Sequence, residues 1–372
     1  MALRMLAINW RDLKNPLAGG AEVHLEENLR RFVKMGHSVT LLASNFSGGA
    51  KEEVVAGVRM LRAGNDYTFN WYVPFMLKSE LKKNSYDVVL EDINKVPFYS
   101  PLFQKLPTLV VVPHLFADAV FQEINFVLGA YIYLAEKPIP WIYRGKKYCV
   151  ISESTRQDLL ARGIPPEDVR VVHCGTDFLL YFKDPNVVKE KDPLVVYLGR
   201  LKKYKSVDHL LAALVKIAVD IPKVRLLVIG DGDDRPRLVD LTRKLGIESR
   251  VTYTGFVPKE DKVNWLRKAW VVVCPSLKEG WGLTNIEANA CGTPVVCANV
   301  PGLRDSVAPG KSGLLYPYGQ VERLAGSLCD LLSNSSLRLH LEKGALEWAK
   351  NFSWDRSAEE MLKLVEEVAQ KR

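Results

Sequence analysis

The sequence predicts an α/β protein built from two doubly wound domains in tandem. The chain has 372 residues, which is enough for two domains of ordinary size, each with its own core. Short β-branched runs alternate with amphipathic helical stretches from end to end, the pattern of parallel sheets covered by helices on both faces. A polar connector interrupts the alternation near the middle, and this interruption indicates a domain boundary.

The first half carries the predicted strands of the first sheet. They are Arg4–Asn9, Ser38–Ala43, Asp87–Glu91, Thr108–Val112, Tyr148–Ser152 and Val169–His173. Helical stretches lie between them, and the clearest, Ala21–Met35, has a broad apolar face and ends at Gly36, a suitable C-cap. The segment Ser154–Gln157 fits a capping box that opens another helix.

The alternation lapses between Thr176 and Pro193 and then restarts. The second set of predicted strands is Leu194–Leu198, Val224–Ile229, Arg250–Tyr253, Val271–Cys274, Pro294–Cys297 and Gly313–Leu315, and Gln320–Arg372 is nearly all helical. We therefore assign residues 1–178 to an N-terminal domain, 179–193 to a linker and 194–350 to a C-terminal domain. Residues 351–372 form a final helix that can cross back to the first domain. In such folds ligands bind beyond the carboxyl ends of the strands, and the cleft between two domains is the natural site.

Composition excludes several classes of protein. Apolar residues make up 48% and charged residues 25% of the chain, the balance of a folded soluble protein, which excludes disorder, collagen and coiled coil. The net charge of +8 is compatible with a phosphorylated ligand or a polyanionic surface. Because acidic and basic residues alternate along most of the chain, we expect no nucleic-acid partner.

The short apolar runs and the spacing of the cysteines both favour a cytoplasmic location. The uncharged apolar run Ile124–Ala135 is shorter than the roughly 20 residues that span a bilayer, and the apolar run at the start is too short for a signal peptide. The six cysteines contain no Cys-x-x-Cys pair, which favours buried thiols in a reducing compartment. These features predict a cytoplasmic protein.

The most informative segment runs from Pro275 to Val296, directly after a predicted strand. Two carboxylates, Glu279 and Glu287, flank a loop that contains Gly280 and Gly282, and a helix follows. The glycines allow a ligand to approach the backbone, and amides at a helix start bind phosphate or sugar oxygens. A carboxylate accepts hydrogen bonds from two adjacent hydroxyls, so Glu287 suits a ribose and Glu279 suits a sugar. Alternatively, Thr284 and Glu287 form a capping box and Glu287 merely caps its own helix.

This segment resembles the signature of the family 4 retaining glycosyltransferases, which have the GT-B fold of two Rossmann-like domains facing a central cleft. The matching residues are Glu279-Gly280-Trp281-Gly282-Leu283, Glu287-Ala288 and Gly292-Thr293-Pro294-Val295-Val296. The resemblance implies that Glu279, a catalytic candidate, contacts the donor sugar and that Glu287 holds the nucleotide ribose. The backbone between them, through Gly280, Trp281, Gly282, Leu283 and Thr284, would meet the diphosphate and the sugar.

Other blocks of the second domain resemble the same family in the same order. Val196–Leu201 with Lys205 is similar to the family's first strand of this domain, which implies that Gly199, Arg200 and Lys205 meet the donor diphosphate. A guanidinium fork and an ammonium group can neutralise the charge that builds on a departing diphosphate. Without that context, both cations read as solvated surface residues. Gly255, Phe256 and Val257 resemble the loop that meets the nucleotide base.

The first domain matches the family more loosely. Asn15–Glu22 resembles the family's glycine-rich loop, which implies that Gly19 and Gly20 approach the diphosphate or the acceptor. His114 follows the strand Thr108–Val112, where the family often has a histidine that faces the donor sugar, although a lone histidine is more often structural. Under this resemblance the first domain binds the acceptor and the second binds the nucleotide-sugar.

We expect neither a metal nor a cofactor other than the nucleotide diphosphate-sugar co-substrate. Asp231-Gly232-Asp233 is an Asp-x-Asp triplet, but it lies in a block of the GT-B type, a fold that generally works without metal. Gly230 and Gly232 are weak evidence for a dinucleotide fold because Arg235 holds the third glycine position. No zinc or P-loop signature occurs in the sequence.

The resemblance implies a retaining transfer. A double displacement needs a carboxylate nucleophile beneath the anomeric carbon, and the sequence nominates none, because Glu279 is expected at the far hydroxyls. Our hypothesis is front-face substitution, in which the leaving phosphate accepts the acceptor's proton and Arg200 and Lys205 stabilise the diphosphate. The alternatives are a nucleotide-sugar epimerase on the same fold and a non-catalytic sugar-nucleotide-binding protein.

The acceptor is predicted from aromatic and basic residues of the first domain. The aromatic side chains are Phe116, Phe121, Phe126, Tyr131, Tyr133, Trp141 and Tyr143, and the cations are Arg144, Lys146, Lys147, Lys78, Lys82 and Lys83. Such a surface suits peripheral contact with an anionic bilayer at the inner face of the cell membrane, and a glycan or polyprenyl-linked acceptor of polysaccharide or glycolipid synthesis. Alternatively, the aromatic residues fill the core and the lysines are solvated.

Overall fold

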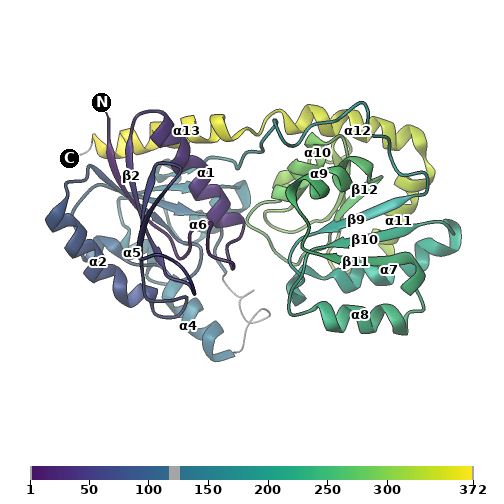
Figure 1. The fold of residues 1–372 in the computed structure, drawn as a ribbon, viewed down its shortest axis with the longest axis horizontal. Coiled ribbons are helices and arrows are strands. Elements are labelled where there is room, and N and C mark those ends of the chain that lie inside the picture. Colours follow the sequence, from purple (N-terminus) through teal and green to yellow (C-terminus); the bar gives the residue numbers. More distant parts are fainter. Residues whose placement is uncertain (1, 117–125, 371–372) are drawn as a thin grey trace. The chain divides into compact units, whose positions relative to one another are not determined.

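The computed structural model describes residues 2–116 and 126–370, and the chain folds into two compact units (Figure 1). The first unit comprises Met1–Gly175 and Trp354–Arg372, and the second comprises Thr176–Ser353. The first unit therefore ends three residues before position 178, where the sequence places the end of the N-terminal domain. Residues 179–193, expected to be a linker, pack within the second unit: the Glu190 carbonyl accepts a hydrogen bond of 2.7 Å from the Trp270 indole.

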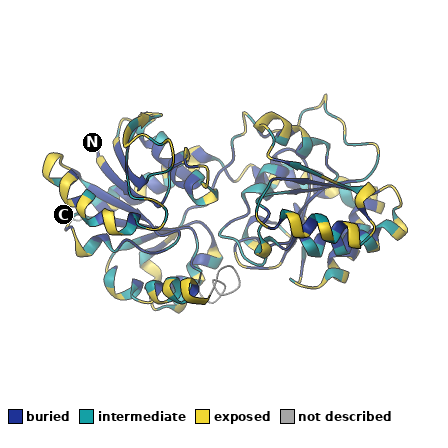
Figure 2. Ribbon diagram, turned by 60° about the horizontal axis from the view of Figure 1, so that its bottom comes forward, coloured by how far each residue is buried: buried dark blue, intermediate teal, exposed yellow. Residues whose placement is uncertain are grey.

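The first unit contains one sheet of eight strands, in the order β3-β4-β2-β1-β5-β6-β7-β8. The strands are β1 (Arg4–Ile8), β2 (Ser38–Ser44), β3 (Glu52–Val55), β4 (Val58–Ala63), β5 (Val88–Asp92), β6 (Thr108–Val112), β7 (Lys147–Val150) and β8 (Val169–Val171). All neighbouring strands pair in parallel except β3 and β4, which form an antiparallel hairpin. Strands β1, β5 and β6 are almost wholly buried, as expected for parallel strands covered on both faces (Figure 2).

Helices cover both faces of this sheet. They are α1 (Gly20–Lys34), α2 (Phe69–Lys83), α4 (Phe126–Glu136), α5 (Ile139–Ile142), α6 (Glu153–Ala161) and α13 (Trp354–Ala369), with 3-10 turns η1 (Ser100–Leu102) and η3 (Pro166–Asp168). On one face, α1 and α13 pack together on the strands through Leu29 and Met361. On the other face, α2 contributes Phe69 and Leu77 to a second apolar cluster.

Parts of the first unit differ from the sequence-based expectations. The pattern of parallel strands did not predict the hairpin β3–β4, because this edge strand is half exposed and has no continuous apolar run. The capping box expected at Ser154 was wrong: helix α6 begins at Glu153, and the Ser152 side chain accepts the hydrogen bond from the Thr155 amide. Phe121 lies outside the described residues.

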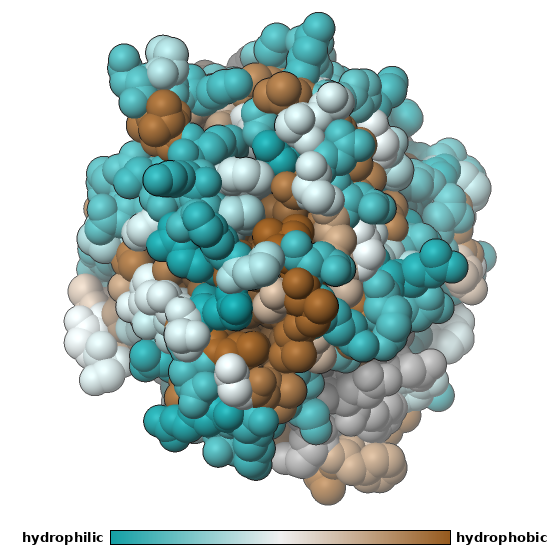
Figure 3. Space-filling view, turned by 90° about the vertical axis from the view of Figure 1, so that its right-hand side faces the viewer, coloured by the Kyte–Doolittle hydropathy of each residue, from teal (hydrophilic) through white to brown (hydrophobic). Residues whose placement is uncertain are grey.

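The second unit contains one fully parallel sheet in the order β11-β10-β9-β12-β13-β14. Its strands are β9 (Leu194–Leu198), β10 (Arg225–Ile229), β11 (Val251–Gly255), β12 (Val271–Cys274), β13 (Val295–Ala298) and β14 (Gly313–Tyr316). Its helices are α7 (Val207–Asp220), α8 (Arg235–Lys244), α9 (Lys259–Lys268), α10 (Leu283–Ala290), α11 (Val321–Ser333) and α12 (Ser335–Ala349), with turns η4 (Lys203–Lys205), η5 (Glu248–Arg250) and η6 (Arg304–Ser306). Figure 3 looks onto this unit, where hydrophilic residues cover most of the visible face and hydrophobic residues form a narrower strip.

Each sheet has one position where the strand order reverses. In the first unit this position lies between β1 and β5, and in the second it lies between β9 and β12. Loops that follow adjacent strands leave in opposite directions there, so a crevice opens at the carboxyl ends of the strands, where ligands of doubly wound sheets bind. Among the residues that the structure describes, no helix combines the length and apolar character needed to cross a bilayer.

Candidate functional site

The loops after β9 and β12 meet at the reversal point of the second sheet. Lys205, in turn η4 after β9, donates a hydrogen bond to the carboxylate of Glu279, in the loop after β12. Each side chain keeps about a fifth of its surface exposed. Burial works against the charge of Lys205, but Glu279 and the nearby Tyr204 outweigh it, so the pKa of the ammonium group is raised. The ammonium group therefore stays charged, and a ligand can still reach the pair.

Close backbone contacts fix these loops. Gly230, after β10, has φ +124°, and a Cβ atom there would lie 2.1 Å from the Gly199 carbonyl oxygen. Gly302, after β13, has φ +80°, and a Cβ atom there would lie 2.0 Å from the Glu279 carbonyl oxygen. Only glycine fits at either position. The second contact positions the Glu279 loop, and no motif in the sequence pointed strongly to Gly302.

The backbone from Gly280 to Thr284 forms the start of helix α10. Gly282 is its N-cap, and the first turn of a helix leaves amide N–H groups without intrahelical partners. Gly280, Leu283 and Thr284 are partly exposed, so an anion can approach these amides. Trp281 is different, because its ring is buried and packs edge-on against Phe352 at 5.4 Å. Only the backbone of Trp281 is therefore suited to ligand contact.

Glu287 does not cap its own helix. The N-cap of α10 is Gly282, so Glu287 is the fifth helical residue and lies beyond the reach of a capping box. Its carboxylate instead accepts hydrogen bonds of 3.1 and 3.0 Å from Lys262 of α9, and a third from the Tyr181 hydroxyl. The Lys262 ammonium also lies 4.9 Å from the centre of the Tyr181 ring. The capping alternative is thereby excluded, and Glu287 lies in a polar cluster at the edge of the site.

The remaining candidates of the second unit lie on the same edge of the sheet. Arg200, two residues after β9, is partly exposed, and its carbonyl accepts a hydrogen bond of 2.9 Å from the Tyr197 hydroxyl. Gly255 ends β11, and the ring of the next residue, Phe256, is 79% exposed. Val257 is half-buried beside it. An exposed aromatic ring at this edge offers a face for stacking a nucleotide base.

The Asp-x-Asp triplet does not bring its carboxylates together. Asp231 accepts a hydrogen bond from the Gly232 amide and lies 3.6 Å from Arg235. Asp233 pairs with Lys202 at 2.9 Å. Within the described ranges no group of three or more His, Cys, Asp or Glu side chains is placed to hold a metal ion. This observation does not test whether the protein works without a metal, so metal independence stays a prediction.

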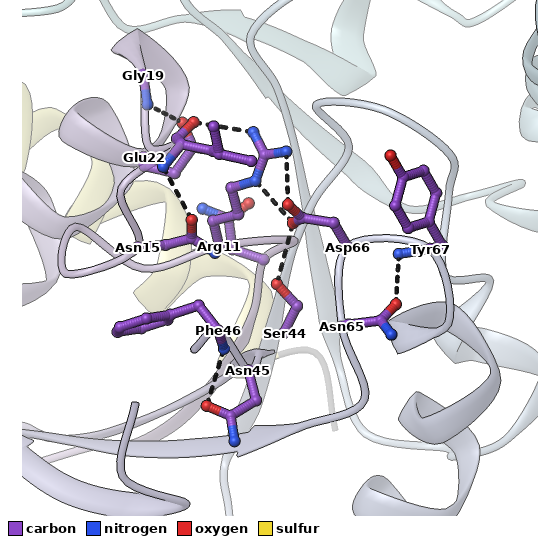
Figure 4. Close-up of polar contacts among 12 residues, drawn as sticks. Arg11, Asn15, Gly19, Glu22, Ser44, Asn45, Phe46, Asn65, Asp66 and Tyr67 are labelled. Atoms are coloured by element: carbon purple, nitrogen blue, oxygen red, sulfur yellow. Dashed lines mark hydrogen bonds and ion pairs between the residues drawn. The ribbon is translucent and has the colours of Figure 1, made fainter. Parts of the chain in front are cut away.

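In the first unit, the glycine-rich loop leads into helix α1. Gly19 is the N-cap, and its amide donates a hydrogen bond of 2.6 Å to the carboxylate of Glu22 (Figure 4). Glu22 therefore accepts a hydrogen bond from the amide at the start of the helix and places a carboxylate there. A carboxylate at this position disfavours a phosphate and favours hydroxyl groups. Gly20 begins the helix, and His114 follows β6 on the same carboxyl edge of the sheet, with its ring 5.0 Å from that of Phe116.

A buried polar cluster lies at the reversal point of the first sheet, between the ends of β1 and β5. Asn94 donates a hydrogen bond of 2.8 Å to Asn9 and one of 3.4 Å to Glu22. Both carboxyl oxygens of Asp92, the Asn9 amide nitrogen and the Asn94 amide oxygen have no hydrogen-bond partner in the described structure. Burial, with the charges of Glu22 and Glu91 nearby, raises the pKa of Asp92 well above its ordinary value.

Several of these residues were not predicted from the sequence. Asn9, Asp92 and Asn94 lie at or just after the carboxyl ends of adjacent strands, and that placement could have identified them. Lys262 and Tyr181 carry no comparable signal, because they come from a helix and a connecting segment that only the folded chain brings to Glu287.

Comparison with known families matches both halves of the chain. Residues 182–348 match the family described as glycosyl transferases group 1. Residues 18–178 match the family described as glycosyltransferase family 4. The two matches fall almost entirely within the second and the first unit, respectively, and together they span most of the chain.

Individual proteins give the same picture. The chain is 36% identical over 221 residues to a D-inositol 3-phosphate glycosyltransferase of Jonesia denitrificans, a match that covers 54% of this chain and 52% of that protein. The match thus spans about half the length of the curated relative. Among solved structures, sucrose-phosphate synthase from Thermosynechococcus elongatus superposes with a TM-score of 0.85 at 22% identity over the full length of both chains. HepE from Anabaena, solved with UDP-glucose, gives a TM-score of 0.76 at 18% identity and covers 98% of this chain and 100% of its own.

Proposed function

Since this chain belongs to the group 1 and family 4 glycosyltransferases and has their GT-B fold, we propose that it moves a sugar from a nucleotide diphosphate-sugar to a glycan or lipid-linked acceptor. The proposed enzyme is a retaining, hexosyltransferase-like transferase of polysaccharide or glycolipid synthesis that uses no metal and no further cofactor. It acts in the cytoplasm, in peripheral contact with the inner face of the cell membrane.

The Lys205–Glu279 contact carries the donor part of this proposal. A phosphate oxygen needs a cation and a sugar hydroxyl needs an acceptor, and the two groups are neighbours in a nucleotide diphosphate-sugar. Lys205 and Glu279 present these complementary groups side by side at the carboxyl ends of β9 and β12. Glu287 then receives the ribose, and the loop Gly255–Val257 receives the base. The UDP-glucose complex of HepE, a protein of the same fold, is consistent with a donor of this class.

The proposed reaction is substitution on the front face of the anomeric carbon. The acceptor oxygen forms the new bond to that carbon while the bond from the carbon to the diphosphate oxygen breaks. The acceptor proton passes to an oxygen of the leaving phosphate, so no protein base is required. Arg200, Lys205 and the amides at the start of α10 stabilise the negative charge that develops on the diphosphate.

The first unit supports a hydroxyl-bearing acceptor. The carboxylate of Glu22 at the start of α1 opposes a phosphate at Gly19 and Gly20, so we assign this loop to the acceptor and not to the diphosphate. The unpartnered groups of Asn9, Asp92 and Asn94 offer both hydrogen-bond donors and acceptors, the set that hydroxyl groups use. His114 lies on the same edge and is assigned to the donor sugar.

The first experiment identifies the donor. We expect UDP-, GDP-, ADP- or dTDP-sugars to raise the melting temperature, and the best of them to yield a glycosylated product with a retained anomeric configuration. Incubation without an acceptor separates the alternatives, because an epimerase changes the donor sugar under those conditions. A donor that binds tightly but is never consumed with any glycan or lipid acceptor contradicts the proposed activity.

Arg200→Ala tests the assignment of charge stabilisation. Because the interaction strengthens as the diphosphate leaves, we expect kcat to fall by about 10²–10³-fold while donor affinity falls much less. Lys202→Ala is the matched control, since Lys202 lies in the same loop but pairs with Asp233 at 2.9 Å. Equal losses in kcat and in donor affinity for Arg200→Ala contradict the assignment.

A further inference from the structure

Helix α2 presents aromatic and basic side chains to solvent along one stripe. Trp71 is 69% exposed and Phe75 is 74% exposed, and Lys78 and Lys82 continue the stripe at helical spacing. Tyr72 and Lys83 lie beside it and are also exposed. The opposite face of α2, with Phe69 and Leu77, packs on the sheet. Isolated exposed apolar residues are normal, but a row of exposed aromatic side chains is not. This stripe therefore indicates an interaction surface.

Helix α4 adds a second exposed apolar stripe. Phe126 and Val127 are each 76% exposed, and Tyr131 and Leu134 follow at the spacing of one helix face. Its sole charged residue, Glu136, is buried and pairs with Arg162. A helix this apolar and this exposed is costly in water.

The two stripes belong to one surface. The Asn70 amide of α2 donates a hydrogen bond of 3.1 Å to the Tyr131 hydroxyl of α4. Ile132 and Ala135 of α4 pack against the same apolar cluster as Val73 of α2. We call the exposed apolar residues of the two helices the α2/α4 surface; they are Trp71, Tyr72, Phe75, Phe126, Val127, Leu128, Tyr131 and Leu134.

The charges around this surface have one sign. Residues 67–84 and 126–146 contain two acidic side chains, Glu80 and Glu136, and both are buried in ion pairs with arginines. All the other charged side chains in these segments are cations; they are Lys78, Lys82, Lys83, Lys137, Arg144 and Lys146. Lys137 and Arg144 also line a pocket with Trp141, whose ring is 73% exposed. The chain as a whole is close to balance, with 51 basic and 43 acidic residues, so the excess is local.

We propose that the α2/α4 surface docks the first unit on an anionic lipid bilayer. Aromatic and aliphatic side chains enter the boundary between headgroups and acyl chains, while the lysines at the end of α2 and the cations after α4 meet lipid phosphates. A second copy of the chain fits this surface poorly, because a symmetric interface would bring the same lysines together. The inference rests on the proposed function for its purpose, since docking would hold the enzyme where lipid-linked acceptors lie.

Vesicle flotation tests this inference with the full chain. Wild-type protein should float with phosphatidylcholine vesicles that contain 30% phosphatidylglycerol, about tenfold less with pure phosphatidylcholine, and less again at 1 M salt. The variant Trp71→Ser/Phe75→Ser should lose at least tenfold in binding. The variant Lys78→Gln/Lys82→Gln/Lys83→Gln should lose 10- to 100-fold and most of its dependence on salt.

Matched controls lie in the second unit. Val219→Ser/Leu339→Ser removes two exposed apolar residues, and Lys223→Gln/Lys244→Gln/Lys343→Gln removes three exposed cations. Both controls should float like wild type. Surface variants that also float like wild type, or equal wild-type binding to neutral vesicles, overturn the inference. So does a wild-type dimer in sedimentation that the Trp71→Ser/Phe75→Ser change dissociates, because a second copy would then cover the surface.

Donor binding separates this inference from the proposed function. Calorimetry with the best nucleotide-sugar should give the same affinity for wild type and for both surface variants. The groups proposed to bind the diphosphate, the ribose and the base lie in the second unit, and neither variant changes His114. Lost vesicle binding with unchanged donor binding supports the docking surface. A chain that floats as expected but binds no nucleotide-sugar leaves the surface standing and overturns the proposed function.

Discussion

The carboxylate of Glu287 is a shared acceptor. A carboxylate has about four acceptor positions, and Lys262 and Tyr181 together donate three hydrogen bonds to this one. One position is left for a ribose hydroxyl. Lys262 also forms an ion pair with Glu287 at 3.0 Å, beside the buried ring of Tyr181. The cluster thereby holds an oriented acceptor at the place where the nucleotide is proposed to bind.

Tyr181→Phe and Glu287→Gln should therefore differ in their effect on nucleotide binding. Tyr181→Phe removes one donor and frees an acceptor position, so we expect the dissociation constant for the donor nucleotide to change by less than about threefold. Glu287→Gln loses the charged acceptor, and binding should weaken about tenfold or more. Isothermal titration calorimetry measures both. If Tyr181→Phe weakens binding as much as Glu287→Gln does, Tyr181 holds the carboxylate in position instead of competing for it.

Asp92 makes the stability of the first unit depend on pH. Its raised pKa means that the folded chain keeps the proton at pH values where the unfolded chain, with a pKa of about 3.9, has released it. The folded state therefore loses stability as the pH rises above about 4. Asp92→Asn removes this titration while keeping the shape of the side chain. The variant should match wild type near pH 3.5 and melt at least about 2 °C higher at pH 8.

Asp66→Asn is a control of opposite sign. Burial works against the charge of Asp66, but its hydrogen bonds and ion pair with Arg11 outweigh burial and lower the pKa of the carboxyl (Figure 4). This group stabilises the fold above the unfolded pKa, so Asp66→Asn should melt lower than wild type at pH 7, with a difference that shrinks in acid.

Melting temperatures that fall for Asp92→Asn at pH 8 would show that its carboxylate is needed for folding. If Asp92 binds the acceptor, Asp92→Asn should melt higher than wild type at pH 8 and also show lower acceptor-dependent turnover.

At the scale of elements, the loop from Ser276 to Gly282 depends on the turn after β13. Gly302 has φ +80°, and its added Cβ would lie 2.0 Å from the Glu279 carbonyl oxygen. Gly310 has φ +72°, and a Cβ there would meet nothing within 4 Å. Gly310→Ala should therefore cost about 1–2 kcal/mol for its backbone conformation alone. Gly302→Ala adds the clash, so it should melt lower still and weaken donor binding at least tenfold, because Glu279 must shift.

Thermal melting and calorimetry with the best donor compare the two alanine variants. Gly310→Ala should bind the donor as wild type does. Equal donor affinities for both variants would show that the Glu279 loop moves out of the way at no cost to the site, which contradicts the supporting role of Gly302.

The elements differ in how far their sequence predicts them. Strands β6, β9, β10 and β12 are mostly apolar runs, because both of their faces are buried, and their bounds agree with the sequence-based prediction to within a residue or two. Hairpin strand β3 is half exposed at a sheet edge and carries no such run. Residues of the site that lie in one motif, such as Glu279 and Glu287, are visible in the sequence. The partners Lys262 and Tyr181 are not, since tertiary folding alone brings them to Glu287.

At the scale of the whole molecule, the first unit is built from two separate segments of the chain, with the second unit between them. Helix α13 follows the whole of the second unit, yet it packs on α1 and the strands of the first unit through Met361, Leu364 and Val365. The first unit therefore completes its core with the last residues of the chain. Each unit has its own sheet and buried core, which is the condition for separate unfolding transitions.

Differential scanning calorimetry should resolve two transitions that respond to different changes. Met361→Ala opens a cavity in the first unit and should cost about 2–5 kcal/mol in that unit alone. Leu328→Ala, in α11, should do the same to the second unit, because this side chain is also fully buried.

A nucleotide-sugar at 100 times its dissociation constant should stabilise its binding unit by about 2.7 kcal/mol. That gain should appear in the transition that Leu328→Ala lowers and not in the one that Met361→Ala lowers. A single transition that moves with every change would mean that the two units unfold together, and a donor that raised the transition lowered by Met361→Ala would place its binding groups in the first unit.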